Sequence, residues 1–244
     1  QLAKMEKPDA YLIAEIWQLD PSWVQGDQYD SLMNYALGRD ILFNFAKGSI
    51  DGEGTLENLS RYFAAYGENV TAMGFNLVSS HDTGRILTDL GGGNFGDLPN
   101  PEAVEKLKLL STLLYTLPGT PVIFQGDERG ILGEKEFYDA HRYPIQWDAV
   151  DENLVSHYKK LSQLRQEISA LTSSVIRVYY GTDKLLSFFR GEQGSGEVLI
   201  VANNGSETVK FELPSGNWRS VTEEETSQGT IHISSLQVRI FEHL

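Results

Sequence analysis

Short apolar runs alternate with longer amphipathic segments through about the first 170 residues of the chain. The runs are nearly continuous, which is typical of strands that are buried on both faces of a parallel sheet. The segments between them carry apolar residues at helical spacing. The pattern predicts strands at residues 10–16, 31–35, 73–78 and 121–125, and helices at residues 39–46, 56–66, 101–117 and 152–168.

Beyond about residue 171 the pattern becomes one of short runs rich in β-branched and aromatic residues. Turn sequences such as "NNGS" at residues 203–206 separate them, as in an antiparallel β-sandwich. We therefore predict two domains, an α/β domain at residues 1–172 and an all-β sandwich at residues 173–244. The predicted sandwich strands are residues 175–180, 185–190, 198–203, 208–213, 218–221, 230–233 and 238–242.

The α/β part holds too few strands to close a barrel. Strands that alternate with helices imply a parallel sheet with right-handed crossovers. A closed (β/α)8 barrel needs about 250 residues, so four units form either a small open sheet or half of a barrel. Residues 2–7 resemble the last turn of a helix that Pro8 ends. We therefore expect further sequence before Gln1.

Composition narrows the possible partners and the compartment. The net charge of −14 argues against nucleic acid and against an anionic membrane, since both attract basic surfaces. The chain contains no cysteine, so it has no disulfide framework and no thiolate metal site. No apolar run reaches the length of a membrane span. These features favour a location in the bacterial cytoplasm and leave secretion open.

Three of the predicted strands end in ionisable residues. The first run ends with Glu15 and Trp17, the third is followed by His81, Asp82 and Arg85, and acidic residues also follow the fourth. In parallel α/β folds the sites are built at the carboxyl ends of the strands. Two carboxyl groups that face one pocket suit glycoside hydrolysis, and Trp17 suits stacking on a sugar. Taken singly, each acid also fits a solvated loop residue or a helix cap.

Four motifs together resemble the α-amylase family of glycoside hydrolases. They are "AEIW" at residues 14–17, "SSHDTGRIL" at 79–87, "PGTPVIFQGDERG" at 118–130 and "HRYPIQW" at 141–147. Their order and spacing are similar to those of the family, and the resemblance covers essentially the whole chain. The segment "GDQYDSLMNYAL" at residues 26–37 resembles the neopullulanase, cyclomaltodextrinase and maltogenic amylase subgroup. The resemblance implies strands five to eight of a TIM barrel, followed by the sandwich.

The resemblance also implies roles for individual residues. Glu15 matches the general acid/base of the family, and Asp82 matches the third carboxylate, which stabilises the transition state. The same comparison implies six substrate-binding positions, among which Arg85 is expected to orient nearby carboxylates or loops. Two of the six, Asp139 and Arg142, rank lower, together with their neighbour His141. The six implied substrate-binding residues are Ile16, Trp17, His81, Arg85, Asp139 and Arg142.

One expected element of the family is missing from the chain. The catalytic nucleophile of the family is an Asp in a Gly-x-Arg-x-Asp pattern after the fourth barrel strand, and this pattern does not occur here. The resemblance therefore implies that the nucleophile lies before Gln1. We expect the chain alone to lack hydrolytic activity, because no covalent intermediate can form without it. A half-barrel also has open sheet edges, so we expect association with the missing half or with another copy.

The expected ligand is an α-glucan, and no cofactor and no metal are expected in this part of the protein. Two other interpretations remain open at this stage. One is a non-catalytic relative that binds glucan or assembles with a partner, and the other is a transglycosylase of the same family. The acid Glu15 favours an enzyme, since a binding protein does not need it.

Overall fold

The computed structural model describes residues 2–136, 138–148, 150–194, 196–221 and 226–244. Its first part contains four parallel strands in the order β1-β2-β3-β4, as the apolar runs predict. They are β1 (Ile13–Ile16), β2 (Ser31–Asn34), β3 (Phe75–Leu77) and β4 (Thr120–Val122). All four are shorter than predicted, because residues at one or both ends of each apolar run lie outside the sheet: the first residues in β1, the last in β2 and β4, and both ends in β3.

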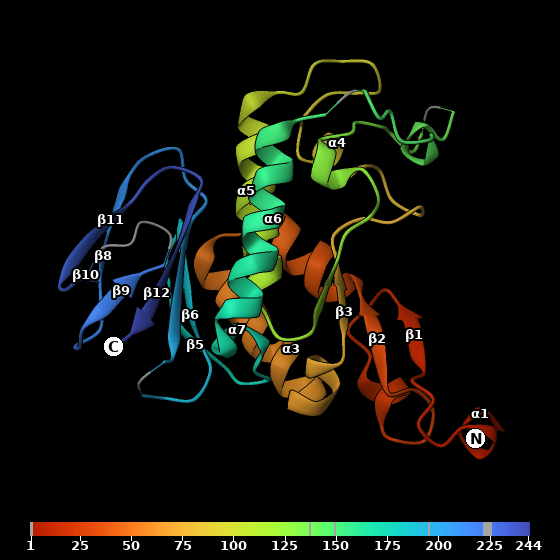
Figure 1. Cartoon of the computed structure of the whole chain (residues 1–244), viewed down its shortest axis with the longest axis horizontal. Helices are drawn as coiled ribbons and strands as arrows, with labels where there is room; N and C mark the ends of the chain where they lie inside the picture. The colour runs from red at the N-terminus through yellow and green to blue at the C-terminus, as the bar shows by residue number, and fades with distance from the viewer. Residues whose placement is uncertain (1, 137, 149, 195, 222–225) are drawn as a thin grey trace.

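Helices connect the four strands. The long helices α3, α5 and α6 lie near the predicted positions and stand between the parallel sheet and the β-rich part (Figure 1). The segment after β2 differs from expectation, since η2 has π-helical hydrogen bonding before it continues as α2. The bounds are α1 Leu2–Glu6, η1 Pro21–Val24, η2 Ala36–Phe43, α2 Asn44–Lys47, α3 Gly52–Ala72, α4 Ile86–Asp89, α5 Pro101–Thr116, η3 Asp127–Arg129, η4 Ala140–Arg142, α6 Glu152–Glu167 and α7 Ser169–Thr172.

Helix α3 extends beyond the predicted residues 56–66 at both ends. It begins earlier because the Asp51 side chain accepts a hydrogen bond from the Gly54 amide and caps the first turn. Gly67 then adopts φ 70° and ψ 170°, which interrupts the helix without ending it. A left-handed φ of this kind suits glycine, because it has no Cβ to clash with the backbone.

The two faces of the parallel sheet are covered differently. On the helical face, Tyr62 of α3 donates to buried Asn34, and Asn34 donates to buried Asn76 on the neighbouring strand, each at 2.5 Å. On the other face, Met33 of β2 pairs in register with Glu15 on one side and with Phe75 on the other. Met33 and Phe75 are only half-buried and Glu15 is exposed. This second face therefore carries no helical layer of the described chain.

The second part of the chain is antiparallel throughout. A six-stranded sheet has the order β10-β9-β12-β7-β6-β5, and β8 pairs with β11 in a separate two-stranded sheet. The predicted strands are found, with β10 in addition. The bounds are β5 Ile176–Gly181, β6 Leu185–Arg190, β7 Val198–Asn203, β8 Val209–Glu212, β9 Trp218–Ser220, β10 Thr226–Ser227, β11 Thr230–Ile233 and β12 Gln237–His243.

Strand β6 shows how the two parts of the chain pack together. All its residues are buried, because the six-stranded sheet lies between the helices and the small sheet. Leu186 and Phe188 belong to the core shared with α3 and α5, whereas Leu185 and Phe189 belong to the core beneath Phe211. The six-stranded sheet thus covers the side of the helical layer that faces away from the parallel sheet. In the described part of the chain no helix is long and apolar enough to cross a membrane.

Candidate functional site

The ends of the first three parallel strands bring the predicted acidic residues into one region. Glu15 lies in β1, and Trp17 follows this strand directly. Tyr35 follows β2, and its ring stacks on that of Trp17 with centroids 3.7 Å apart and planes 11° apart. His81 and Asp82 lie in the loop after β3. Because parallel strands end on the same edge of the sheet, these loops meet there.

The pKa of the Tyr35 hydroxyl is affected by the charges of both predicted catalytic carboxylates. Its side chain is 1% exposed, and burial raises the pKa of the Tyr35 hydroxyl. The charges of Glu15 and of Asp82 raise that pKa further, while a hydrogen bond with Ser80 lowers it. The two carboxylates therefore act in the same direction on one buried hydroxyl.

His81 and Asp82 form a partly exposed pair. The His81 side chain is 69% exposed and that of Asp82 is 35% exposed, with His81 Nε2 3.4 Å from Asp82 Oδ2. Both can therefore reach a ligand that approaches from solvent. The amide of Asp82 donates to the Ser80 hydroxyl at 3.1 Å, which fixes the backbone of the loop from inside.

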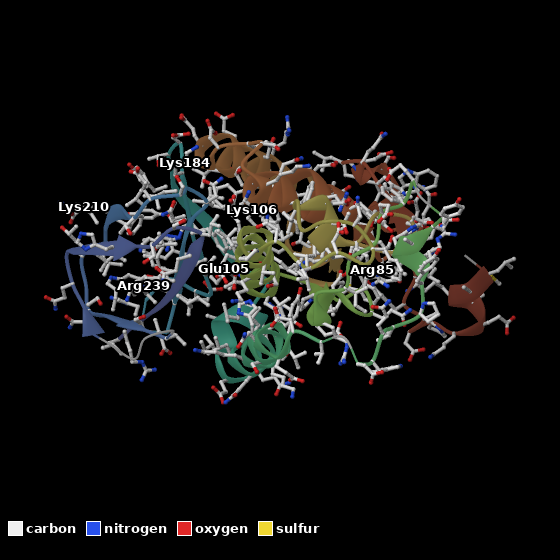
Figure 2. The ribbon with its side chains drawn as sticks, turned by 90° about the horizontal axis from the view of Figure 1, so that it is seen from above. Arg85, Glu105, Lys106, Lys184, Lys210 and Arg239 are labelled. Carbon is white, nitrogen blue, oxygen red and sulfur yellow. The ribbon has the colours of Figure 1, made fainter. Side chains whose placement is uncertain are left out.

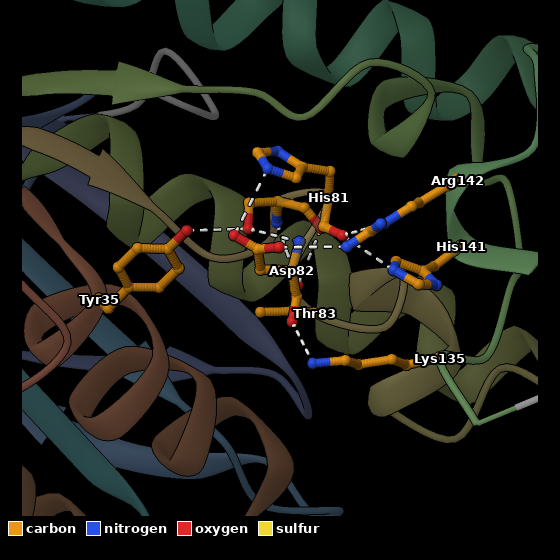
Figure 3. Close-up of polar contacts among 8 residues, drawn as sticks. Tyr35, His81, Asp82, Thr83, Lys135, His141 and Arg142 are labelled. Carbon is orange, nitrogen blue, oxygen red and sulfur yellow. Dashed lines mark hydrogen bonds and ion pairs between the residues drawn. The ribbon is translucent and has the colours of Figure 1, made fainter. Parts of the chain in front are cut away.

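The loop after β4 holds this pair from the other side (Figure 3). The His81 carbonyl accepts hydrogen bonds from His141 Nε2 at 2.9 Å and from Arg142 Nε at 2.6 Å. Arg142 also donates to Asp82 Oδ1 at 3.2 Å, and Lys135 donates to the Asp82 carbonyl at 2.8 Å. Arg142 thus neutralises Asp82 in part and orients its carboxylate. The contact with His141 requires the proton on Nε2, since a carbonyl only accepts.

Two residues of the site, Lys135 and Tyr35, were not predicted from the sequence. Lys135 and Tyr35 both lie more than 40 positions from Asp82 in sequence, and no motif in the chain connects either of them with it. Tyr35 ends an apolar strand, where an aromatic residue usually indicates only packing. Their roles follow from contacts across the strand ends, which the chain order does not reveal.

Arg85 occupies a different environment from the one that a substrate-binding residue would have. Its side chain is 0% exposed and stands inside the α/β part (Figure 2). It donates to the Gln125 carbonyl, lies 3.8 Å from Asp127 Oδ1 and covers the ring of Phe124 at 4.3 Å. Arg85 therefore lies behind the loop that carries Asp82, and it joins this loop to the loop after β4.

Asp127 is buried with Arg85 and receives a hydrogen bond from the Ser79 hydroxyl. Burial raises the pKa of Asp127 to about 7, against the opposing effects of Ser79 and of the Arg85 charge. Burial likewise lowers the pKa of Arg85. Sequence reasoning treats Asp127 as a loop acid, and the structure instead places it beneath the candidate site.

The remaining predicted residues lie at the margin of the site. Ile16 is half-buried and pairs in register with Asn34, so it belongs to the helical face of the sheet. Asp139 is exposed, has φ 53°, and accepts the Arg142 amide on its carbonyl at 2.9 Å. Its backbone therefore starts the short helix that presents Arg142.

A cavity of about 440 Å³ opens beside the site. Its lining includes Trp17, Tyr35, Asp82 and Lys135, together with charged residues of η2. A larger cavity of about 870 Å³ lies at the amino ends of α5 and α6, and it contains none of the predicted catalytic or substrate-binding residues. Among the residues that the structure describes, no three His, Cys, Asp or Glu side chains gather in a way that could hold a metal ion.

Comparison with known proteins agrees with the motifs. The family model described as alpha amylase, catalytic domain, matches residues 1–174. The maltogenic alpha-amylase of Bacillus acidopullulyticus is 34% identical over 216 residues, which are 86% of this chain and 35% of that protein. Neopullulanase 2 of Thermoactinomyces vulgaris is 34% identical over 219 residues, which are 88% of this chain and 35% of that protein. The chain thus spans about a third of the length of these curated relatives.

A solved structure extends the likeness over nearly all of the chain. The type III pullulan hydrolase from Thermococcus kodakarensis matches with a TM-score of 0.94 and 55% identity, over 98% of this chain and 41% of that chain. The family model covers more than half of the 244 residues, and three of the four motifs include or closely follow an observed parallel strand. The chain belongs to the α-amylase family.

Proposed function

We propose that this chain is the acid-bearing part of a retaining α-glucan hydrolase. The single observation that supports it best is the position of the two acids at the carboxyl ends of parallel strands, Glu15 in β1 and Asp82 in the loop after β3. Relatives named for maltogenic amylase and for neopullulanase activity make an α-glucan the expected substrate. In this proposal strands β1 to β4 correspond to barrel strands five to eight, and the domains are residues 1–172 and 173–244.

Each charged group then has a role in a two-step reaction. Glu15 protonates the glycosidic oxygen as the bond to the anomeric carbon breaks, while a carboxylate nucleophile from a part of the protein outside this sequence forms the glycosyl ester. In the second step Glu15 takes a proton from the incoming water, which attacks the anomeric carbon and releases the nucleophile. Asp82 supplies negative charge beside the oxocarbenium-like transition state.

The surrounding residues position these groups or contact the sugar. His81 is exposed beside Asp82 and is available to donate to a sugar hydroxyl. Trp17 presents a partly exposed ring on the wall of the 440 Å³ cavity, which suits stacking on the apolar face of a glucose unit. Arg142 orients the Asp82 carboxylate, and the Asp139 carbonyl accepts the amide of Arg142. Buried Arg85 acts from behind by holding the loop of Asp82.

The test is release of reducing ends from maltodextrin and from cyclomaltodextrin. The 244-residue chain is assayed alone and after co-expression with the part of the Thermococcus kodakarensis enzyme that it does not match. We expect no activity from the chain alone, activity from the complex, and loss of that activity with Glu15→Gln. Glu57→Gln, an exposed acid on α3, is the matched control.

Each other outcome selects a different interpretation. Activity of the chain alone that Glu15→Gln abolishes would mean that the nucleophile lies within these residues. An inactive complex that still binds cyclomaltodextrin would favour a non-catalytic glucan-binding relative. Transfer to added maltose that exceeds hydrolysis would favour a transglycosylase. Association with a second copy and a cytoplasmic location stay predictions that this assay does not address.

A further inference from the structure

Strands β1 and β3, whose ends carry the two proposed catalytic carboxylates, are not neighbours in the sheet. Strand β2 lies between them, so no backbone ladder directly connects the end of β1 with the end of β3. Both strands are also short, with four residues in β1 and three in β3. The ladder joins them only through β2, and Asp82 lies beyond the end of β3 at Leu77, so side chains that cross the end of β2 help to set the relative position of Glu15 and Asp82.

Tyr35 stands at that crossing point. It is the residue directly after β2, and its side chain is 1% exposed. Toward β1, its ring lies flat against Trp17, two residues beyond Glu15, with centroids 3.7 Å apart. This contact restricts the indole and the chain that leads to it, because the faces of the two rings are in van der Waals contact.

Toward β3, the hydroxyl of Tyr35 begins a short chain of hydrogen bonds. It donates to Ser80 Oγ at 2.8 Å, and Ser80 Oγ in turn accepts the amide of Asp82 at 3.1 Å (Figure 3). Ser80 is itself buried, and its amide donates to Thr83 Oγ1 at 3.0 Å. The hydroxyl therefore selects the Ser80 rotamer that caps the Asp82 amide.

We propose that Tyr35 is a positioning residue that couples the two proposed catalytic carboxylates, through the Trp17 stack on one side and through Ser80 on the other. The catalytic roles of Glu15 and Asp82 rest on the proposed function, but the contacts of Tyr35 with Trp17 and Ser80 do not depend on it. A tyrosine that serves only the core would use its ring for packing, and its hydroxyl would connect to no loop of the site.

Tyr62 provides a matched control for that plainer interpretation. It is also 1% exposed, and its hydroxyl donates to buried Asn34 at 2.5 Å. It lies on the helical face, away from the loop after β3. Tyr62→Phe and Tyr35→Phe each remove one buried hydroxyl from the same part of the protein. A general loss of stability should thus affect both variants alike.

The first readout is amide hydrogen exchange of Asp82, measured by NMR on the 244-residue chain without substrate. One hydrogen bond contributes about 0.5–1.5 kcal/mol, so we expect Asp82 exchange to become roughly two- to tenfold faster in Tyr35→Phe. The Trp17 indole resonance should stay in place in this variant and move in Tyr35→Leu, which loses the stack. Tyr62→Phe should leave both signals unchanged.

The second readout is catalysis by the co-expressed complex described above. We expect Tyr35→Phe to lower kcat roughly two- to tenfold and to leave KM nearly unchanged, because alignment of the reacting groups matters most in the transition state. Unchanged Asp82 exchange in Tyr35→Phe, or an equal change in Tyr62→Phe, would overturn the coupling. An inactive wild-type complex with the expected exchange pattern would instead refute the glycosidase while the coupling stands.

Discussion

The buried carboxyl of Asp127 should make the chain less stable as the pH rises. The nearby charge of Arg85 acts in the opposite direction, because it lowers the pKa of Asp127. Asp127 is 2% exposed, and burial raises its pKa from 3.8 to about 7. Between these values the folded state keeps a proton that the unfolded state has lost. The folded state then binds more protons, so the free energy of unfolding falls as the pH rises, until the folded carboxyl also ionises.

The size of the effect follows from the pKa difference. One pKa unit corresponds to about 1.4 kcal/mol, and about two units lie between pH 5 and the folded pKa of Asp127. We therefore expect Asp127→Asn to gain about 3 kcal/mol in stability relative to the wild-type chain between pH 5 and pH 8. The Asn side chain keeps the size of the carboxyl group but does not titrate.

The assay is urea denaturation of both proteins at half-unit pH intervals. Subtracting the two curves cancels groups that titrate alike in both proteins. A second pair, Arg85→Met with and without Asp127→Asn, should show the same sign with a midpoint above pH 7, since the cation that lowers the pKa of Asp127 is gone. A difference that is flat, or that falls as the pH rises, would refute the reasoning, because the Arg85 charge would then outweigh burial.

Two further perturbations test the packing of the α/β part. Burial lowers the pKa of His157 to about 4, so stability should rise between about pH 4 and 6.5, by up to roughly 3 kcal/mol. His157→Gln should lose this dependence in urea denaturation, and an unchanged slope would contradict it. A Cβ on Gly38 would lie 1.8 Å from the Leu77 carbonyl oxygen, so Gly38→Ala should cost about 1–3 kcal/mol or more. A melting temperature equal to that of Gly54→Ala would exclude this clash.

The strands and the exposed part of the site could be predicted because their signals are local. Each apolar run leads directly into the polar residues that follow it, so the sequence places His81 and Asp82 after a strand. Parallel pairing then brings the strand ends to one edge. The register and the π-helical turn of η2 could not be predicted, since they depend on packing against α3 and α5.

The supporting contacts could not be predicted because they join residues far apart in the chain. Arg85 and Asp127 are 42 positions apart, and either one alone has the sequence signature of a surface charge. Tyr35 and Ser80 meet across 45 positions, and both are ordinary residues for their local pattern. The sequence thus identified the groups that face solvent and also Arg85, but it did not identify Asp127 or Tyr35, whose roles depend on burial and on contacts across the chain.

Glu15, the proposed acid, lies on the uncovered face of the parallel sheet. Glu15, Met33 and Phe75 lie in one row across β1, β2 and β3, and the row is only partly buried. Parallel sheets are normally covered on both faces, so the apolar members of this row favour a further layer. A nucleophile carried on strands that complete this layer would approach Glu15 from the face to which Glu15 already points. Under the proposed function, one further set of strands would both cover this row and carry the nucleophile that the mechanism requires.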